Sequence, residues 1–396
     1  MRISIIGPAF PLRGGIAHHV YWLHRQLTAR GHSVQVISYR RLYPRIFFPG
    51  TTEIDNSNLK LDAGAVPVLG PLDPRSWRRA FKLIEGFEPD AIIFQWWQPF
   101  FGPLVGTLAR RLRKSGAKSL VECHNVFPHE GTPIDRILLK FGLSPFESFI
   151  AHSKSDARKL TSIVANRKIV VAALPSLAEF SGQTGGGRSG KTILFFGKVR
   201  KYKGLDVLIK AMPAVLSEVE CKLVIAGEFY DSLQRYEALL RELGLEQRVR
   251  IDNRYVPNEE VPGLFEQADV LVLPYITATQ SAVARIALSN ALPVIASDSG
   301  GLSETVVPNV NGLLFPSGDS SALAECLISY FRRGLGPTFS ANIRSAMRGQ
   351  SESDLIGAIE YIASCSLSAT PGDTCERDEA GDAPTAVRSN YCRTAK

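Results

Sequence analysis

Short apolar runs without strict polar alternation recur in the first half of the chain, and segments with helical periodicity separate them. These runs span residues 2–7, 33–38, 91–97, 119–125 and 149–153. Successive apolar residues predict strands that are buried on both faces. Strands that alternate with helices predict a parallel sheet covered by helices on its two faces. The first half is therefore predicted to be a doubly wound α/β domain.

The same pattern restarts after residue 190. Its runs span residues 192–197, 222–227, 249–253, 269–275 and 293–297. Between the two sets lies SGQTGGGRSG at 181–190, which has the composition of a flexible linker. The sequence thus predicts two Rossmann-like domains, at 1–180 and 191–345. A late helix is expected at 351–364, and the polar composition of 367–396 predicts a disordered tail.

Charge and cysteine usage limit the setting and the partners of the chain. Residues 1–180 contain 24 Lys and Arg against 13 Asp and Glu. This excess favours an anionic partner such as phosphate, a membrane surface or nucleic acid, although a solubilising surface explains it equally well. No apolar run reaches the roughly 18 residues of a membrane span. The six cysteines form no CxxC pair, which is typical of a reducing, cytoplasmic setting.

Three turns that follow predicted strands suit phosphate binding, because ligands bind beyond the carboxyl ends of parallel strands and helix N-termini there attract anions. The candidates in these turns are Gly14 and Gly15, then Lys198 and Lys203, and finally Thr279, Gln280 and Ser281. Two lysines five positions apart can converge on one diphosphate, although an exposed basic loop has the same pattern. The third turn carries no carboxylate between Pro274 and Asp298, and its only charge is Arg285.

Together these motifs resemble the retaining glycosyltransferases of family 4, also called glycosyl transferases group 1, which have the GT-B fold. The matching segments are RGG at 13–15, HN at 124–125, AHSKSDARKL at 151–160, GKVRKYKG at 197–204, the segment 255–275, and PVIASDSGGLSETV at 293–306. The resemblance covers roughly residues 1–335. It implies that the C-terminal domain binds a nucleoside-diphosphate sugar and that the N-terminal domain binds a glycan or a lipid-linked acceptor. The two domains would face each other across a cleft, and helix 351–364 would cross back onto the first domain.

The resemblance also assigns roles to residues. Lys198 and Lys203 occupy the positions of the diphosphate-binding Arg and Lys, so Lys198 replaces a planar fork with a point charge. His124 takes the position of the cleft histidine at the donor sugar. Further donor contacts are expected at Glu304 and at the backbone of Tyr255 and Val256. The expected residues on the acceptor side are His18, His19, His129 and Glu130.

One departure from the family concerns the third turn. Most members carry a Glu-x7-Glu pair whose acids meet the donor sugar and the ribose, but Ala278 and Ile286 occupy those positions here. The stretch resembles a branch of the family with a T-Q-S turn. We expect Gln280, with backbone amides near Ser281, to take over polar contacts to the donor. The ribose contact has no candidate.

The expected chemistry is transfer with retention, without a cofactor or a metal. No Asp-x-Asp motif follows a suitable strand, and the departing phosphate is expected to take the acceptor's proton. A double displacement through Glu130 or Glu304 is the alternative route. A non-catalytic nucleotide-sugar-binding or scaffold protein is the alternative function. An oxidoreductase or epimerase is disfavoured because GxGxxG is absent, and nucleic-acid binding because no recognition motif is present.

Two N-terminal segments are basic and amphipathic, at 75–84 and 102–118. Their apolar stripes are expected to pack on the sheet. Their cationic faces could dock on an anionic membrane, which predicts peripheral association with the inner face of the membrane.

Overall fold

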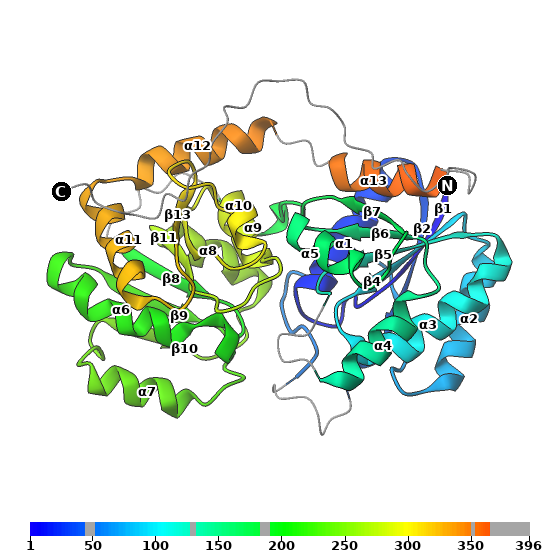
Figure 1. Cartoon of the computed structure of the whole chain (residues 1–396), viewed down its shortest axis with the longest axis horizontal. Coiled ribbons are helices and arrows are strands. Elements are labelled where there is room, and N and C mark those ends of the chain that lie inside the picture. The colour runs from blue at the N-terminus through cyan, green and yellow to red at the C-terminus, as the bar shows by residue number, and fades with distance from the viewer. Residues whose placement is uncertain (44–51, 127–131, 183–190, 350–352, 365–396) are drawn as a thin grey trace.

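The computed structural model describes residues 1–43, 52–126, 132–182, 191–349 and 353–364. These residues form two α/β domains that lie side by side, each built around its own sheet (Figure 1). None of the helices in the described ranges is long and apolar enough to cross a membrane.

Both sheets are parallel, and the strand order of the second repeats that of the first. The first sheet runs β3 (Val66–Leu69), β2 (Ser33–Tyr39), β1 (Arg2–Ile6), β4 (Ala91–Trp96), β5 (Lys118–Cys123), β6 (Ser148–Ala151), β7 (Lys168–Val171). The second runs β10 (Val249–Asp252), β9 (Lys222–Ala226), β8 (Thr192–Phe196), β11 (Val270–Leu273), β12 (Val294–Ser297), β13 (Gly312–Phe315). This order, in which the chain starts at the centre and winds outward in both directions, is that of a doubly wound fold. The predicted fold class is confirmed.

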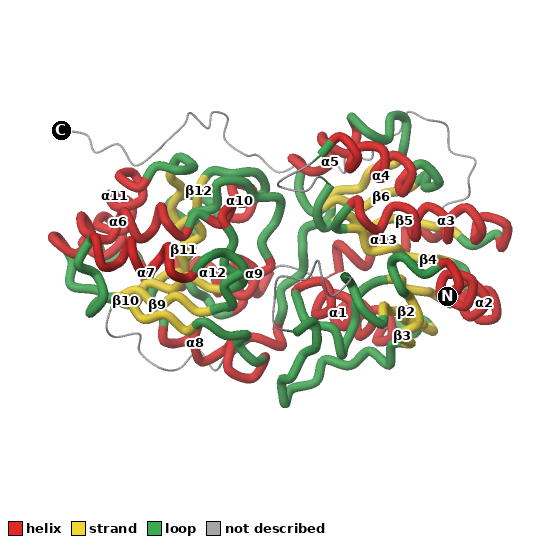
Figure 2. Tube along the Cα trace, turned by 90° about the horizontal axis from the view of Figure 1, so that it is seen from below, coloured by secondary structure: helices red, strands yellow, loops and turns green. Residues whose placement is uncertain are grey.

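Helices cover both faces of each sheet (Figures 1 and 2). Those of the first domain are α1 (Gly15–Ala29), α2 (Pro74–Phe87), α3 (Gly102–Leu112), α4 (Pro133–Leu143) and α5 (Lys154–Thr161). Those that follow are α6 (Leu205–Glu218), α7 (Leu233–Glu242), α8 (Val261–Gln267), α9 (Ala282–Ser289), α10 (Leu302–Thr305), α11 (Ser320–Arg332), α12 (Gly336–Gly349) and α13 (Ser353–Ser364).

Three strands were not predicted, namely β3, β7 and β13. Each has four residues and lies at the edge of its sheet. An edge strand pairs on one side only, so it can be short, and β3 contains Pro67, which cannot donate to a neighbouring strand. Their position does not by itself explain the omission, because β10 is also a four-residue edge strand and was predicted, and β7 and β13 lie in the apolar runs 169–174 and 313–315.

The last helix returns to the first domain. Along α13 the side chains of Leu355, Ile356, Ile359 and Ile362 are buried. Glu360 on its polar side accepts hydrogen bonds from Arg30 at 2.8 Å and from His32 at 2.9 Å. In Figure 1, α12 lies over the second domain and α13 over the first. The predicted tail at 367–396 and most of the predicted linker at 181–190 lie outside the described residues.

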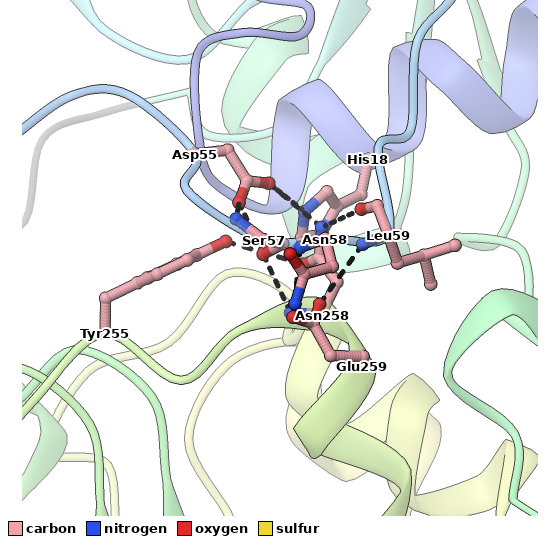
Figure 3. A network of polar contacts seen from close by, with 8 residues as sticks. All are labelled: His18, Asp55, Ser57, Asn58, Leu59, Tyr255, Asn258 and Glu259. Carbon is pink, nitrogen blue, oxygen red and sulfur yellow. Dashed lines mark hydrogen bonds and ion pairs between the residues drawn. The ribbon is translucent and has the colours of Figure 1, made fainter.

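A polar network joins the two domains beside α1 (Figure 3). Asn258 of the second domain donates from its side-chain nitrogen to Asp55 at 2.9 Å, and its backbone nitrogen donates to Ser57 Oγ at 2.9 Å. Glu259 accepts from the backbone nitrogens of Asn58 and Leu59. Burial alone would raise the pKa of Asp55, but hydrogen bonds from His18, Ser57 and Asn258 outweigh it and lower that pKa. The carboxylate of Asp55 is thereby kept ionised between the domains.

Candidate active site

A cavity of about 370 Å³ lies between the domains, where the strand order of each sheet reverses. In-register pairing brings the carboxyl ends of β1 and β4 to one edge, and β8 and β11 end likewise in the other sheet. Ligands of doubly wound sheets bind at such points. The predicted site residues that line the cavity are Gly15, His19, His124, Lys203, Thr279, Gln280 and Ser281.

The N-termini of two helices lie against each other in the lining of this cavity. A Cβ built on Gly15, the first residue of α1, would lie 3.6 Å from the Cβ of Ala282, the first residue of α9. Ser281 caps α9, because its Oγ accepts from the backbone nitrogen of Ala284 at 3.2 Å. The first-turn amides of a helix lack intrahelical partners and lie at the positive end of its dipole. The two helices therefore create an environment that favours an anion.

Lys203 adds a positive charge to the cavity. Its side chain is buried, with Nζ 5.2 Å from the centre of the Tyr275 ring. Burial lowers the pKa of Lys203. The loop that holds it turns at Gly204, where φ is 64° and a Cβ would lie 1.9 Å from the carbonyl oxygen of Pro274. Only glycine fits there, because the loop after β8 lies directly against the loop after β11.

Lys198 lies outside the cavity lining, beside a buried interdomain ion pair. Arg13 of the first domain contacts Glu228 of the second at 2.5 Å. The ammonium group of Lys198 lies 5.3 Å from the centre of the Tyr230 ring. Burial, with further contributions from Arg13 and Arg200, lowers the pKa of Lys198 to about 8. The diphosphate role predicted for Lys198 stays a prediction.

No Asp or Glu is found among the described residues that line the cavity, whereas Lys203 and Arg285 both line it. The residues at the two positions of the family's acid pair explain part of this absence of carboxylates. Ala278 lines the cavity without a charge, and the side chain of Ile286 is buried in the apolar core. The cavity thus has two cationic side chains, two helix N-termini and no compensating acid.

A hydrogen-bonded chain fixes the orientation of His124. The fully buried carboxylate of Glu122 accepts from Gln95 Nε2 at 2.7 Å, and Gln95 Oε1 lies 2.5 Å from His124 Nε2. Because the amide must present its NH₂ group to the carboxylate, its oxygen faces the histidine. His124 Nε2 therefore carries the proton, and Nδ1 is left as an acceptor. Burial lowers the pKa of His124 well below its usual range, so the ring is neutral.

Gly7, directly after β1, leaves space for the hydrogen-bonded side chains of Glu122, Gln95 and His124. A Cβ at this position would lie 2.6 Å from Cγ of Gln95. A larger residue would push Gln95 away from Glu122 and His124.

The other oxygen of Glu122 faces His19 of α1, with 2.7 Å between Nε2 and Oε1. His152 Nε2 lies 3.3 Å from the same oxygen, and its Nδ1 donates to the carbonyl oxygen of Ala172. Burial alone would raise the pKa of Glu122, but His19 and His152 outweigh it and hold that pKa well below its usual range. One ionised carboxylate thus anchors side chains from α1, β4 and the turn after β6.

By residue type, His19, Glu122, His124 and His152 could also hold a metal ion, since their ligand atoms lie within 4.8 Å of one another. Hydrogen bonds already join most of these atoms: His19 is bonded to Glu122, and His124 is bonded to Gln95. A metal would have to displace the protons in both bonds. The cluster therefore fits a hydrogen-bonded network better than a metal centre.

Two predicted donor residues make interdomain contacts instead of pointing freely into the cavity. Gln280 Nε2 donates to the backbone oxygen of His152 at 2.9 Å. The Glu304 carboxylate accepts from the backbone nitrogens of Lys154 and Ser155 at 2.8 and 3.0 Å. These nitrogens belong to the first turn of α5, which attracts a carboxylate. Glu304 does not line the cavity, whereas Gln280 does.

The remaining predicted residues also lie outside the cavity lining. Tyr255 stacks against the guanidinium group of Arg13, 4.8 Å from its ring centre, and Val256 is buried in the core. His18 faces Asp55 and packs on Phe180, with 4.9 Å between the ring centres. Gly14 caps α1 without lining the cavity. His129 and Glu130 lie outside the described residues.

Sequence reasoning missed several residues of this site. Gln95, Glu122 and His152 were not singled out, although each is a polar residue at the carboxyl end of an otherwise apolar strand, which is a usable signal. Arg13 and Glu228 pair across 215 positions, and no local pattern reveals that contact.

The fold and the cavity define a two-domain α/β protein whose cavity, between two Rossmann-like domains, is lined by cationic groups and favours an anion. Residues 13–173 match the sequence model of "Glycosyltransferase Family 4", and residues 190–333 match that of "Glycosyl transferases group 1". The chain belongs to this glycosyltransferase family and has its GT-B fold.

The chain is similar to several proteins over different lengths. It is 26% identical to a phosphatidyl-myo-inositol mannosyltransferase of Mycobacterium leprae, over 84% of this chain and 88% of that protein. It is 36% identical to an uncharacterised glycosyltransferase of Methanocaldococcus jannaschii, over 33% of each chain, so that match spans a third of the relative's length. Sucrose-phosphate synthase from Thermosynechococcus elongatus shares the fold, with TM-score 0.69 and 19% identity over 91% of this chain and 96% of that one. Anabaena HepE in complex with UDP does so too, with TM-score 0.67 and 15% identity over 92% and 98%.

Replacing Glu122 by Gln should lower the free energy of unfolding by about 3 kcal/mol, because breaking a buried charged network removes the partner of the remaining groups. Urea unfolding followed by circular dichroism measures the change. The control is Glu85→Gln, an exposed carboxylate on α2, which should change stability by less than about 0.5 kcal/mol. Equal unfolding midpoints for the two variants would contradict the anchoring role of Glu122.

Proposed function

We propose that this glycosyltransferase moves a sugar from a nucleoside-diphosphate sugar to a glycan or lipid-linked acceptor, with retention of anomeric configuration and without a metal. The observation that carries the proposal is the acid-free cavity beside two adjoining helix N-termini, lined by Lys203. Such a cavity favours the diphosphate of a donor and the negative charge that develops on it as it leaves.

The donor diphosphate is placed at the start of α9, within reach of Lys203. Ser281 orders this helix start, and the amides of its first turn would donate to phosphate oxygens. Lys198 would add a second ammonium group from the same loop. Because burial disfavours both charges in the free protein, an incoming anion would stabilise them.

For a transfer with retention, the absence of a carboxylate from the described cavity lining favours a front-face reaction over a double displacement. A double displacement needs a carboxylate beside the anomeric carbon. Glu122 lies in its buried network, and Glu304 is bonded to α5. We infer that the acceptor attacks the face that the diphosphate leaves, and that a phosphate oxygen takes the acceptor's proton. His124 Nδ1, as an acceptor, would orient a hydroxyl group of the donor sugar.

A non-catalytic nucleotide-sugar-binding protein is a second candidate, favoured by one observation. The two acids that most family members place in this turn are replaced by Ala278 and Ile286. Release of nucleoside diphosphate from the donor would separate the two proposals, since a binding protein would retain the sugar nucleotide intact.

Peripheral association with the inner face of a membrane is proposed from the surface of the first domain. On α2 the apolar residues Ala80 and Ile84 are buried, while Arg75, Arg78, Arg79 and Lys82 are exposed. On α4, which packs on α3, Ile134 and Ile137 are 65% and 68% exposed, and Phe141 continues the same stripe with Arg110 of α3 4.1 Å from its ring centre. Basic groups beside exposed apolar side chains suit an anionic lipid surface and would bring a lipid-linked acceptor to the cleft.

The donor site predicts stabilisation by one nucleoside diphosphate. At about 100 times its Kd a ligand adds roughly 2.7 kcal/mol to stability. Thermal unfolding with UDP, GDP and ADP should show a clear rise in Tm for at least one, which Lys203→Ala should abolish. Lys210→Ala, an exposed lysine on α6, should keep the rise. The donor site would be refuted if none of the three nucleotides shifted the wild type.

Donor affinity should weaken above pH 8, because Lys198 loses its charge as pH rises through its lowered pKa of about 8. Once the ammonium is titrated, Kd should rise by up to about tenfold per pH unit. Calorimetric titration with a nucleotide sugar between pH 7 and 9.5 measures this. Lys198→Arg keeps its charge and should bind with little dependence on pH over that range. Parallel pH profiles for the two proteins would remove Lys198 from the donor site.

Vesicle binding tests the membrane proposal. Full-length protein should co-sediment with vesicles containing anionic phospholipid at low salt and be released at high salt. The triple variant Arg75→Gln, Arg78→Gln, Arg79→Gln should bind several-fold less. The matched control is Lys210→Gln, Lys222→Gln, Arg241→Gln in the second domain, where the residues are also exposed. Equal loss in both variants would show only a general charge effect and overturn the assignment of this face.

A further inference from the structure

Arg285 is a cation in the cavity without a protein partner. It lies one turn inside α9 and lines the cavity. Its Nε is enclosed and makes no hydrogen bond, and within the described ranges no carboxylate pairs with its guanidinium group. Burial lowers the pKa of Arg285, and no opposing contribution offsets it. An arginine nevertheless stays charged in a protein, so this charge is held at a cost in stability.

Purely structural roles do not account for this residue. A buried charge is ordinarily paired or fully hydrogen-bonded. Arg285 is also the only charged residue between Pro274 and Asp298. A neutral residue at this position would avoid the cost, which indicates that the missing partner comes with a ligand.

The side chains of Arg285 and Lys203 lie on different sides of the start of α9. The Cβ position of Gly197 lies within 3.5 Å of both Lys203 Nζ and Val283, so the lysine lies on the Val283 side of the helix. Two positions along a helix are separated by about 200° of rotation, and Arg285 therefore points roughly 160° away from Val283. It lies closer to the face of Ala282, which is opposite Gly15 of α1.

We propose that Arg285 forms a second anion subsite, distinct from that of the donor diphosphate, which binds a carboxylate or phosphate group of a substrate. The proposal rests on the proposed function for the position of the diphosphate. The guanidinium fork can bind either group with two parallel hydrogen bonds. Ile16, Pro175 and Leu177, which line the same cavity, are apolar, and apolar surroundings strengthen such an ion pair.

The anion has two possible sources, and both satisfy the same chemistry. It is either the carboxylate of a uronic acid carried by the donor or a phosphate group carried by the acceptor. Calorimetric titrations compare wild type with Arg285→Gln and Lys203→Gln. The probes are UDP or GDP, whichever binds; the matching nucleotide sugars with a neutral hexose and with a hexuronic acid; and inorganic phosphate, alone and on top of saturating nucleotide.

The subsite predicts that Arg285→Gln binds the nucleoside diphosphate within about twofold of wild type, whereas Lys203→Gln binds it at least tenfold more weakly. If the donor supplies the anion, wild type should prefer the hexuronic-acid nucleotide at least tenfold over the neutral one, and Arg285→Gln should lose that preference. If the acceptor supplies it, inorganic phosphate should still bind to the nucleotide-saturated wild type and fail to bind to Arg285→Gln.

Two results would overturn the subsite. In one, Arg285→Gln weakens nucleoside-diphosphate binding as much as Lys203→Gln does, which would make Arg285 a diphosphate ligand. In the other, wild type and Arg285→Gln respond identically to both the hexuronic-acid nucleotide and phosphate. Failure of the proposed function looks different, because no nucleotide would then bind to wild type, while phosphate alone could still distinguish the Arg285 variant.

The Tm of the ligand-free protein gives an independent test of the subsite. Removing an unpaired charge whose Nε is enclosed should leave the Tm of the free protein equal to or above that of wild type. Arg285→Lys should keep part of the anion response, because it keeps the charge without the fork. A clear fall in Tm for Arg285→Gln would assign the side chain a structural role and contradict the subsite.

Discussion

The ionised carboxylate of Glu122 is the interaction on which the first half of the site depends. It has no solvent contact, and the groups around it come from α1, β4 and the turn after β6. A buried charge is tolerated only when donors surround it, so the carboxylate fixes the side chains that it binds. Its effect reaches the cavity through Gln95, whose amide leaves His124 only one tautomer. The orientation and the tautomer of this ring are therefore set by a charge that does not line the cavity, whereas its neutrality comes from burial.

The second half of the site relies on the opposite arrangement, in which positive groups lack a protein acid. In the first domain a carboxylate satisfies the histidines, whereas Lys203 and Arg285 at the start of α9 have no carboxylate beside them in the described cavity lining. The difference matches the tasks of the two sides. A hydrogen-bonding side chain must be held in one orientation before a sugar arrives, but a site for phosphate must keep its charges uncompensated until the anion binds.

Much of the fold could be predicted, because central parallel strands are buried on both faces and therefore consist of continuous apolar runs. The edge strand β3 escaped because Pro67 interrupts its short run, whereas β7 and β13 lie in apolar runs that were overlooked. The turns 197–204 and 274–281, which form one wall of the cavity, could also be predicted because their motifs are local in the sequence.

The rest of the site depends on contacts between distant residues. Glu304 sits in a motif, yet its carboxylate binds the backbone of α5 in the other domain. Tyr255 meets Arg13, and Gln280 meets the backbone of His152, through the same packing of domain against domain.

These interdomain contacts connect the two halves energetically. Glu304, Gln280 and Asn258 each make a hydrogen bond to the first domain, and Arg13 reaches Glu228 in the second. They hold the start of α1 against the start of α9, two positive helix ends that would otherwise repel each other. An anion between those ends reverses the sign of that interaction. The contact between the domains and the proposed affinity for an anionic substrate would thus depend on one electrostatic balance, in which the polar contacts offset the repulsion until a substrate binds.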